Sequence, residues 1–319
     1  MSERLERHQA WLYLAAILLG LALGSTATGA AQRLEVLVWP LLALLLYATF
    51  TQVALTGLPS ALRDGRFVAA VLVGNFLVLP LAVWALLPLV GTDVAVRTGV
   101  LLVLLVPCTD WFLTFTHLAG GDTRRAIAVT PVNLLVQLVL LPLYLWLFLG
   151  EAFAQAVATP RAVTALTTLI LLPLVAAWGT QLLAVHRQRT VVVARLGALP
   201  VPLLAAVVFS IAASQISVVL DAGRALPRLV LVYVAFLVVA AALGLALARL
   251  LGLEPGAGRV LVFSMGTRNS FVVLPIALAL PAGFEIAVVV VVLQSLVELF
   301  GMVAYLRLVP RLTRRSAAG

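Results

Sequence analysis

Apolar stretches of about 20 residues recur from one end of this 319-residue chain to the other. A stretch of that length crosses the hydrocarbon layer of a membrane as a helix, because a helix satisfies its own backbone hydrogen bonds where water is absent. Hydropathy, with Gly, Pro and Arg as breaks, gives approximate spans at 11–28, 36–56, 67–90, 96–117, 125–149, 161–183, 199–219, 228–250, 259–280 and 285–306. The sequence therefore predicts an all-α membrane protein of about ten transmembrane helices.

Composition supports this prediction and excludes several classes of protein. The chain is 64% hydrophobic and 10% charged, whereas soluble domains carry about 25% charged residues. Its net charge of +9 comes from arginines scattered over short loops, which argues against a nucleic-acid partner. A single cysteine excludes an internal disulfide and a multi-thiolate metal site. The usual hydrolase, zinc-protease and phosphate-binding motifs are absent, so we expect neither an enzyme nor a cofactor.

The arginines predict the orientation of the helices. Most of them fall on one side if the N-terminus is cytoplasmic, as with Arg124 and Arg125, while few fall on the other side, as with Arg33 and Arg97. This bias predicts a multi-pass protein of a bacterial inner membrane with both termini in the cytoplasm. Membrane lipid is then an expected partner.

An odd number of helices inverts whatever follows them. Five helices in residues 1–155 and five in residues 156–319 would form a 5+5 inverted repeat within one membrane domain, the plan of many secondary transporters. In such proteins the solute site lies near the middle of the membrane, at matched helices that are broken by polar residues. The fourth span, broken at 106–111, and the ninth, broken at 264–270, occupy equivalent places in the two halves.

These two breaks contain the candidate substrate-binding residues. An Asp or Arg at the centre of a bilayer costs roughly 2.5 to 3.5 kcal/mol, so each normally faces a partner or a hydrated cavity. Asp110 and Arg268 are the obvious pair. They could form a structural ion pair, or both could line a solute site. The residues predicted for the site are Cys108, Thr109, Asp110, Arg268, Asn269 and Ser270.

Other polar residues lie within the predicted spans. Glu298 could face a small aqueous vestibule or take part in coupling, and Gln294 lies one helical turn before it. Asn133 and Gln137 share one helix face and could line a cavity, and Asn75 lies in the third span; interhelical hydrogen bonds are the ordinary role of such residues. In the tight loop before the fifth span, we expect an aspartate, Asp122, to cap the helix.

Cys108 follows a proline inside the first break. A buried cysteine is most often a small apolar side chain. A single thiol is also a soft ligand, and it would bind a metalloid reversibly where three thiols would trap it. Both roles stay open from the residues alone.

The stretch from Pro107 to Asp122, followed by Ala128-Val129-Thr130, resembles the region between the fourth and fifth helices of the bile acid:sodium symporter superfamily, which includes arsenite permeases of the arsenical-resistance type. The resemblance extends over essentially the whole chain and implies a secondary transporter with ten helices, a 5+5 inverted repeat, and broken fourth and ninth helices that cross. In the arsenite permeases a cysteine occupies the first broken helix, and Cys108 matches it. Asn269 matches an asparagine of their ninth helix, whereas Val272 stands where they have a glutamate.

The chain departs from the sodium-coupled branch of this superfamily at four positions. Phe112 and Leu113 replace a Ser-Asn pair of the fourth helix, while Ser264 and Arg268 replace a glutamate and a glutamine of the ninth. Because sodium needs several hard oxygen ligands, and a cation now stands among these positions, we expect no sodium dependence.

Three hypotheses about function follow. The first is an efflux permease or antiporter for arsenite, antimonite or a related small solute, in which Cys108 contacts the solute and protons are a possible coupling ion. The second keeps the fold and moves an organic anion, bound by Arg268. The third is a membrane sensor or scaffold that transports nothing.

Overall fold

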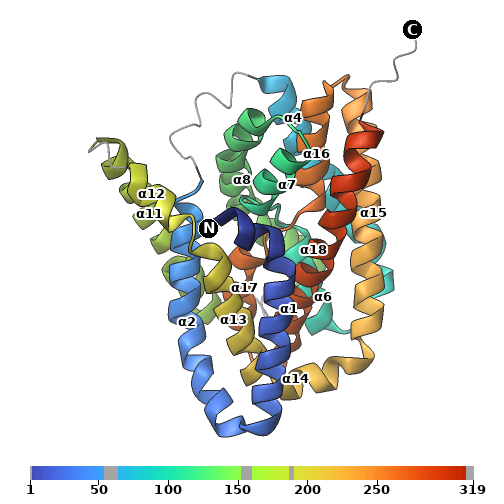
Figure 1. Ribbon diagram of the computed structural model, residues 1–319. Helices are drawn as coiled ribbons and strands as arrows, with labels where there is room; N and C mark the ends of the chain where they lie inside the picture. The colour runs from blue at the N-terminus through green and yellow to red at the C-terminus, as the bar shows by residue number, and fades with distance from the viewer. Residues whose placement is uncertain (1, 54–63, 152–159, 187–189, 314–319) are drawn as a thin grey trace. The chain divides into compact units, whose positions relative to one another are not determined.

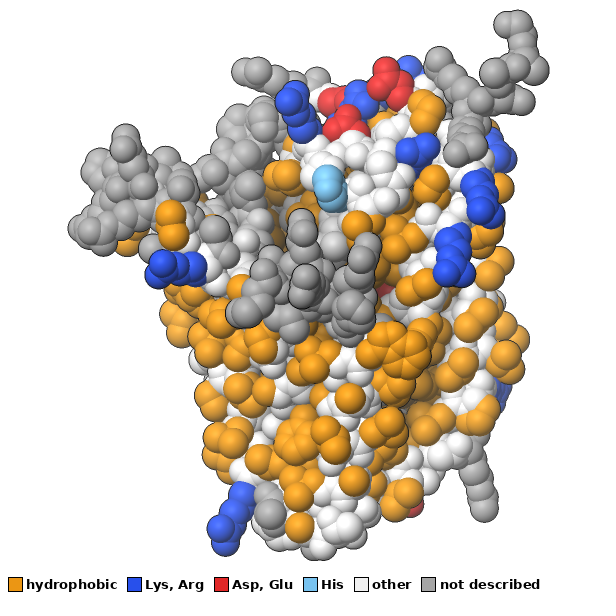
Figure 2. Space-filling model, viewed as in Figure 1, with side chains coloured by type: hydrophobic (Ala, Val, Ile, Leu, Met, Phe, Trp, Pro, Cys, Tyr) orange, Lys and Arg blue, Asp and Glu red, His pale blue; other side chains and the backbone are white. Residues whose placement is uncertain are grey.

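The computed structural model describes residues 2–53, 64–151, 160–186 and 190–313, and the elements in these ranges are helices. Six of the described helices are long and apolar enough to cross a membrane: Arg33–Phe50, Gly65–Val90, Thr123–Leu149, Thr167–Ala184, Leu226–Leu250 and Ile286–Leu312. Shorter apolar helices cover Trp11–Thr26, Val94–Leu104 and Pro200–Ser214. Hydrophobic side chains cover much of the surface seen in Figure 2. The protein is therefore an all-helical, multi-pass membrane protein.

The chain forms two compact units, and each draws on both halves of the sequence. Unit 1 comprises Met1–Gln52, Ala154–Leu226 and Phe271–Val292, whereas unit 2 comprises Val53–Phe153, Pro227–Ser270 and Leu293–Gly319. The predicted boundary between the two repeats, at residues 155 and 156, lies outside the described residues.

Unit 1 is built on α1 (Ser2–Thr26), α2 (Thr28–Phe50) and α13 (Pro200–Ser214), which lie side by side (Figure 1). Two glycines of α1 allow a close approach to α13, because a Cβ atom on Gly20 or Gly24 would lie 2.4 or 2.5 Å from a backbone oxygen of α13. On α11 (Leu172–His186), Thr180 lies 2.9 Å from the Tyr47 hydroxyl of α2. None of the predicted site residues lies within the residue ranges of unit 1.

Unit 2 holds every predicted site residue. Its helices are α4 (Gly65–Val73), η2 (Gly74–Val78), α5 (Leu79–Val90), α6 (Val94–Leu104), α7 (Trp111–Leu118), α8 (Thr123–Leu149), α15 (Leu226–Leu250), α16 (Pro255–Gly266) and the second part of α18 (Ile286–Leu312). Within it, α16 packs against α4, α7 and α8 (Figure 1). Both breaks predicted from the sequence are present, because the helix stops at Leu104 and resumes at Trp111, and stops at Gly266 and resumes at Ser270 in α17 (Ser270–Leu278).

A proline shapes the third predicted span. Pro80 has no backbone N–H, so the carbonyl four residues earlier, that of Phe76, loses its helical donor. The helix widens into the π-turn η2 just before the proline, and the Tyr144 hydroxyl donates to the Phe76 carbonyl instead. Asn75 lies in this widened turn. The bulge therefore presents a polar side chain from a helix that is otherwise apolar.

Aspartates cap the helices of unit 2. Asp122 accepts hydrogen bonds from the backbone N–H groups of Arg124 and Arg125, both at 3.1 Å, which confirms the cap predicted from the sequence. Asp64 caps α4 in the same way by accepting from Phe67 at 3.2 Å. Each cap satisfies N–H groups that a helix start leaves without a partner.

One arginine joins three helix starts at this end of unit 2. The Arg125 guanidinium lies 2.8 Å from Asp64, 3.4 Å from Asp122 and 3.3 Å from Glu254, which precede α4, α8 and α16. The starts of these helices lie together in Figure 1, and charged side chains gather at the same end in Figure 2. The network therefore fixes the relative positions of three helices through one side chain.

We expect Arg125→Ala to destabilise the protein in detergent by about 1 kcal/mol, since the pairs are partly exposed but share one cation. The loss should shrink at high salt, which screens such pairs. Thermal unfolding at low and high salt measures it. Arg124→Ala, an exposed arginine on the same turn, is the matched control and should change little. Equal effects of the two substitutions would contradict a role for the network.

Candidate solute-binding site

The two broken segments of unit 2 cross as a short antiparallel pair. The Cys108 N–H donates to the Thr267 carbonyl at 3.1 Å, and the Asn269 N–H donates to the Val106 carbonyl at 2.8 Å. Between these bonds, Pro107 stands opposite Arg268 in an isolated bridge. This pattern takes its hydrogen bonds from the flanking residues, so proline fits at the central position without a donor of its own.

The side chains of the crossing form a polar cluster that is buried except at Asp110, which is partly exposed. The Asn269 amide donates to the Thr109 hydroxyl at 3.0 Å and links the two segments a second time. The Cys108 thiol donates to the Asp110 carboxylate at 3.2 Å. Asp110 also caps α7 by accepting from the Trp111 N–H at 2.6 Å. The thiol and the carboxylate predicted for the site are therefore in direct contact.

Arg268 is 2% exposed, and its guanidinium donates to neutral oxygens. The Nη2 group donates to the Asn75 side-chain oxygen at 2.9 Å and to the carbonyls of Ser264 at 2.9 Å and Met265 at 2.8 Å. The Nη1 group donates to the Leu104 carbonyl at 3.3 Å, and the Phe236 ring lies 5.5 Å from the guanidinium carbon. The sequence suggested Asp110 as the partner of Arg268, whereas these contacts come from an amide, three carbonyls and an aromatic ring.

The Glu298 carboxylate binds the backbone of Arg268 rather than its guanidinium. One of its oxygens accepts from the Arg268 N–H at 2.8 Å and from the Gln294 amide at 2.7 Å. The Ser270 hydroxyl donates to the Gln294 oxygen at 3.0 Å, which extends the chain of bonds to the start of α17. The other Glu298 oxygen is buried and has no hydrogen-bond partner among the described residues.

Asn133 and Gln137 both lie on α8, and they differ in their hydrogen bonds. The Asn133 amide approaches the Ser264 hydroxyl at 3.4 Å, and that hydroxyl also accepts from Asn75 at 2.9 Å. Gln137 is 1% exposed, yet neither atom of its amide has a hydrogen-bond partner among the described residues. Buried polar atoms of this kind are ordinarily satisfied by water or a bound molecule. They mark the α8 side of the cluster as a place where a small polar molecule would gain hydrogen bonds.

Close packing holds the crossing in place. A Cβ atom on Gly266, the last residue of α16, would lie 2.4 Å from the Tyr305 ring of α18. The Tyr305 hydroxyl donates to the Leu237 carbonyl, so the ring cannot swing aside without losing that bond.

We therefore expect Gly266→Ala to destabilise the protein by about 1 to 3 kcal/mol through overpacking. Thermal unfolding of the purified protein measures the loss. Gly179→Ala is the control, because nothing lies within 4 Å of a Cβ atom there. That helical substitution should be neutral or stabilising. If both changes were equally tolerated, the contact with Tyr305 would not limit the site.

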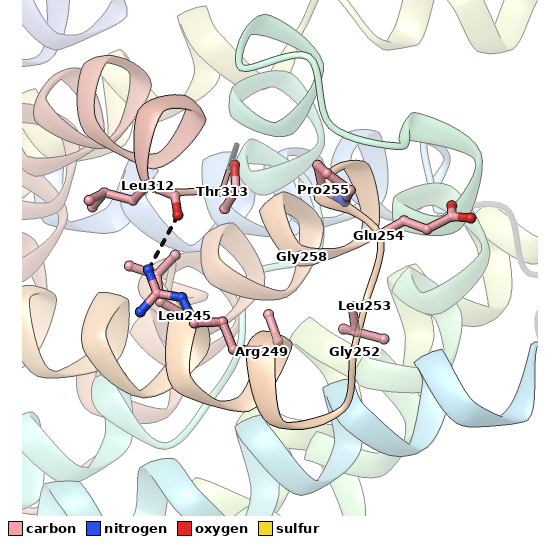
Figure 3. Close-up of a pocket in the computed structure, with 10 residues that line it drawn as sticks. Leu245, Arg249, Gly252, Leu253, Glu254, Pro255, Gly258, Leu312 and Thr313 are labelled. Carbon is pink, nitrogen blue, oxygen red and sulfur yellow. Dashed lines mark hydrogen bonds between the residues drawn. The ribbon is translucent and has the colours of Figure 1, made fainter. Parts of the chain in front are cut away.

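A separate cavity of about 310 Å³ lies at the other end of α16 (Figure 3). It is lined by the ends of α15 and α18 and the start of α16, and it includes Arg249, whose guanidinium donates to the Leu312 carbonyl at 3.4 Å. None of the predicted site residues lines it. The crossing thus remains the candidate site.

Sequence reasoning missed several contributors to the crossing. Phe236 is one more aromatic residue in an apolar span, and the Leu104 carbonyl belongs to an apolar residue, so neither carries a signal. Ser264 could be found because it lies in the polar break of the ninth predicted span.

The chain was compared with models of protein families. A family model described as "Sodium Bile acid symporter family" matches residues 39–222, which include Cys108, Thr109 and Asp110. A comparison with curated proteins found no match.

Proposed function

The chain belongs to the sodium bile acid symporter family, whose members are secondary transporters rather than enzymes, and on this premise we propose that it moves a small arsenite-like solute past Cys108 without using sodium. The observation that carries the proposal is the crossing within unit 2. It brings together a buried thiol and a buried amide, those of Cys108 and Asn269, with the partly exposed carboxylate of Asp110, all from two interrupted helices. Interrupted helices in the membrane are tolerated where they line a site.

A soft solute is favoured over an organic anion by the contacts of Arg268. Both terminal nitrogens of its guanidinium already donate to oxygens of the protein. Binding a carboxylate or sulfonate there would break those bonds and leave buried carbonyls without donors, which is costly. The Cys108 thiol donates a hydrogen bond to Asp110, and a sulfur ligand suits trivalent arsenic or antimony.

Sodium independence is supported by the same arginine. A fixed cation that already contacts Asn75, Ser264 and Met265 repels a second cation and uses the oxygens that would bind it. Protons remain the candidate coupling ion, and Glu298, with one buried oxygen lacking a partner among the described residues, is the candidate carrier.

We propose the 5+5 inverted repeat as the architecture of the transporter, with repeats at residues 1–155 and 156–319. In its support, unit 1 contains the first two predicted spans of each half, and unit 2 contains the third to fifth spans of the first half with the eighth span and parts of the ninth and tenth. Apart from Phe271–Val292, which belong to unit 1, that is the partition expected if equivalent helices of two repeats pack together. An inner-membrane location with cytoplasmic termini is part of the same proposal.

The test is a flux panel in proteoliposomes that contain only this protein. Arsenite, antimonite, an organic carboxylate and an organic sulfonate are each offered under an imposed proton gradient, an imposed sodium gradient, and neither. We expect flux of the two metalloids that responds to the proton gradient and ignores sodium. Anion flux driven by sodium would refute the substrate and the coupling together, and the absence of flux for every solute would favour a sensor or scaffold.

A further inference from the structure

The Nη2 group of Arg268 has more acceptors than hydrogens. It carries two N–H bonds, as every guanidinium terminus does. Three oxygens nevertheless surround it at 2.8 to 2.9 Å, from Asn75, Ser264 and Met265. An arrangement with surplus oxygens resembles the coordination of a positive charge more than a set of paired hydrogen bonds. We call these three oxygens and the Leu104 carbonyl the oxygen cage.

The carbonyls of the oxygen cage are those that the helix breaks set free. In an unbroken helix the Ser264 and Met265 carbonyls would accept from residues 268 and 269. Those N–H groups instead donate to Glu298 and to the Val106 carbonyl. The Leu104 carbonyl loses its donor in the same way, because the Cys108 N–H donates to Thr267.

The guanidinium therefore lies where α6 and α16 both end. A helix end leaves its last carbonyls without donors and carries a partial negative charge. Two such ends meet at Arg268, with the Glu298 carboxylate at its backbone and the Phe236 ring beside it. A cation is needed at this point if the crossing is to be stable, and the side chain of Arg268 supplies it from within the chain.

We propose that the oxygen cage is a cation-binding site, which Arg268 fills with its own side chain. When Arg268 is replaced by alanine, the cage is left empty and binds guanidinium or ammonium. Three oxygens of the cage lie 2.8 to 2.9 Å from Nη2, the ordinary length of an N–H···O hydrogen bond, and the Leu104 carbonyl lies 3.3 Å from Nη1, so a nitrogen cation fits without rearrangement. Arg268 is then a positioning residue that holds the two breaks together. This inference concerns binding alone and does not depend on which solute is transported.

The experiment is chemical rescue of purified Arg268→Ala. Its unfolding temperature is measured against increasing guanidinium chloride or ammonium chloride in the millimolar range, with choline chloride holding the ionic strength constant. We expect the variant to unfold below the wild type, and a saturable rise of about 4 °C or more at saturating guanidinium or ammonium. The wild type, whose cage is filled, should show no such rise.

Arg249→Ala is the matched control, because its guanidinium contacts the Leu312 carbonyl away from the cage. It should show no rise with guanidinium. A folded Arg268→Ala that gives no saturable rise with either nitrogen cation overturns the proposal. An equal rise with sodium chloride overturns the assignment to nitrogen cations.

A second pair of variants covers the case in which Arg268→Ala does not fold. Arg268→Lys keeps an ammonium group within the cage region, whereas Arg268→Met keeps length without charge. We expect folded yield from the lysine variant to exceed that from the methionine variant, and the methionine variant to gain yield when guanidinium is present during purification. Equal yields in every condition would overturn the proposal. These readouts do not use transport, so they fail separately from the proposed function.

Discussion

Cys108→Ser is expected to lower the uptake of arsenite into everted membrane vesicles about tenfold or more, the effect of losing a contact worth about 1.4 kcal/mol. Serine is smaller, and its hydroxyl can still donate to Asp110 as the thiol does. The substitution therefore keeps the local hydrogen bond and removes the soft ligand. Initial rates of uptake, normalised to the amount of folded protein, measure the effect.

Cys108→Ala separates the two roles of the thiol. If sulfur contacts the solute, serine and alanine should be equally defective, while the unfolding temperature should fall only for alanine, which leaves Asp110 without that donor. Normal uptake by the serine variant would refute the role of Cys108. A defect shared by organic anions would indicate damage to the crossing rather than loss of a metalloid ligand.

The sequence could predict where the helices break but not what each break does. Polar residues and Pro107 in otherwise apolar spans mark 106–111 and 264–270, and the helices stop at both places. Such residues are costly in a membrane unless they have partners, so their positions carry information. The number of membrane spans is harder to determine than the positions of the breaks. A break divides a span into pieces such as α6 and α7, and each piece is too short to cross a membrane alone.

The partners of Arg268 could not be predicted, for a physical reason. Charge alone suggested Asp110, the acidic residue in the equivalent break. The structure supplies mainly backbone carbonyls, and every residue has one, so nothing in the identity of Leu104 or Met265 points to the contact. Which carbonyls become available depends on where N–H groups are diverted by the crossing, and that is a property of three-dimensional packing.

The role of Asn75 is indicated by another residue, Pro80, which lies five positions later in the chain. As an isolated polar residue it predicted an ordinary interhelical hydrogen bond. Its role follows from Pro80, which removes a helical donor and widens the turn that contains Asn75. A proline five residues after a buried amide could therefore have indicated a bulge, but the direction of that amide toward Arg268 needed coordinates.

Glu298→Leu is expected to lower the free energy of unfolding by about 2 to 5 kcal/mol, since it leaves two buried donors without an acceptor, at about 1 to 3 kcal/mol each. Leucine has a similar size, so the loss would not come from a cavity. Glu298 is 1% exposed, and it accepts from the Arg268 N–H at 2.8 Å and from Gln294 at 2.7 Å. Both donors, the Arg268 N–H and the Gln294 amide, would lose their acceptor. Chemical or thermal unfolding in detergent measures the loss.

Glu298→Gln tests the coupling role without this damage. Its amide oxygen can accept from the Arg268 N–H, so we expect the variant to fold far better than Glu298→Leu, although it carries no charge and binds no exchangeable carboxyl proton. If Glu298 carries the coupling proton, flux in the glutamine variant should no longer respond to an imposed proton gradient, while downhill exchange of solute continues. Flux that still follows the proton gradient would assign coupling to another group and leave Glu298 a structural role at the crossing.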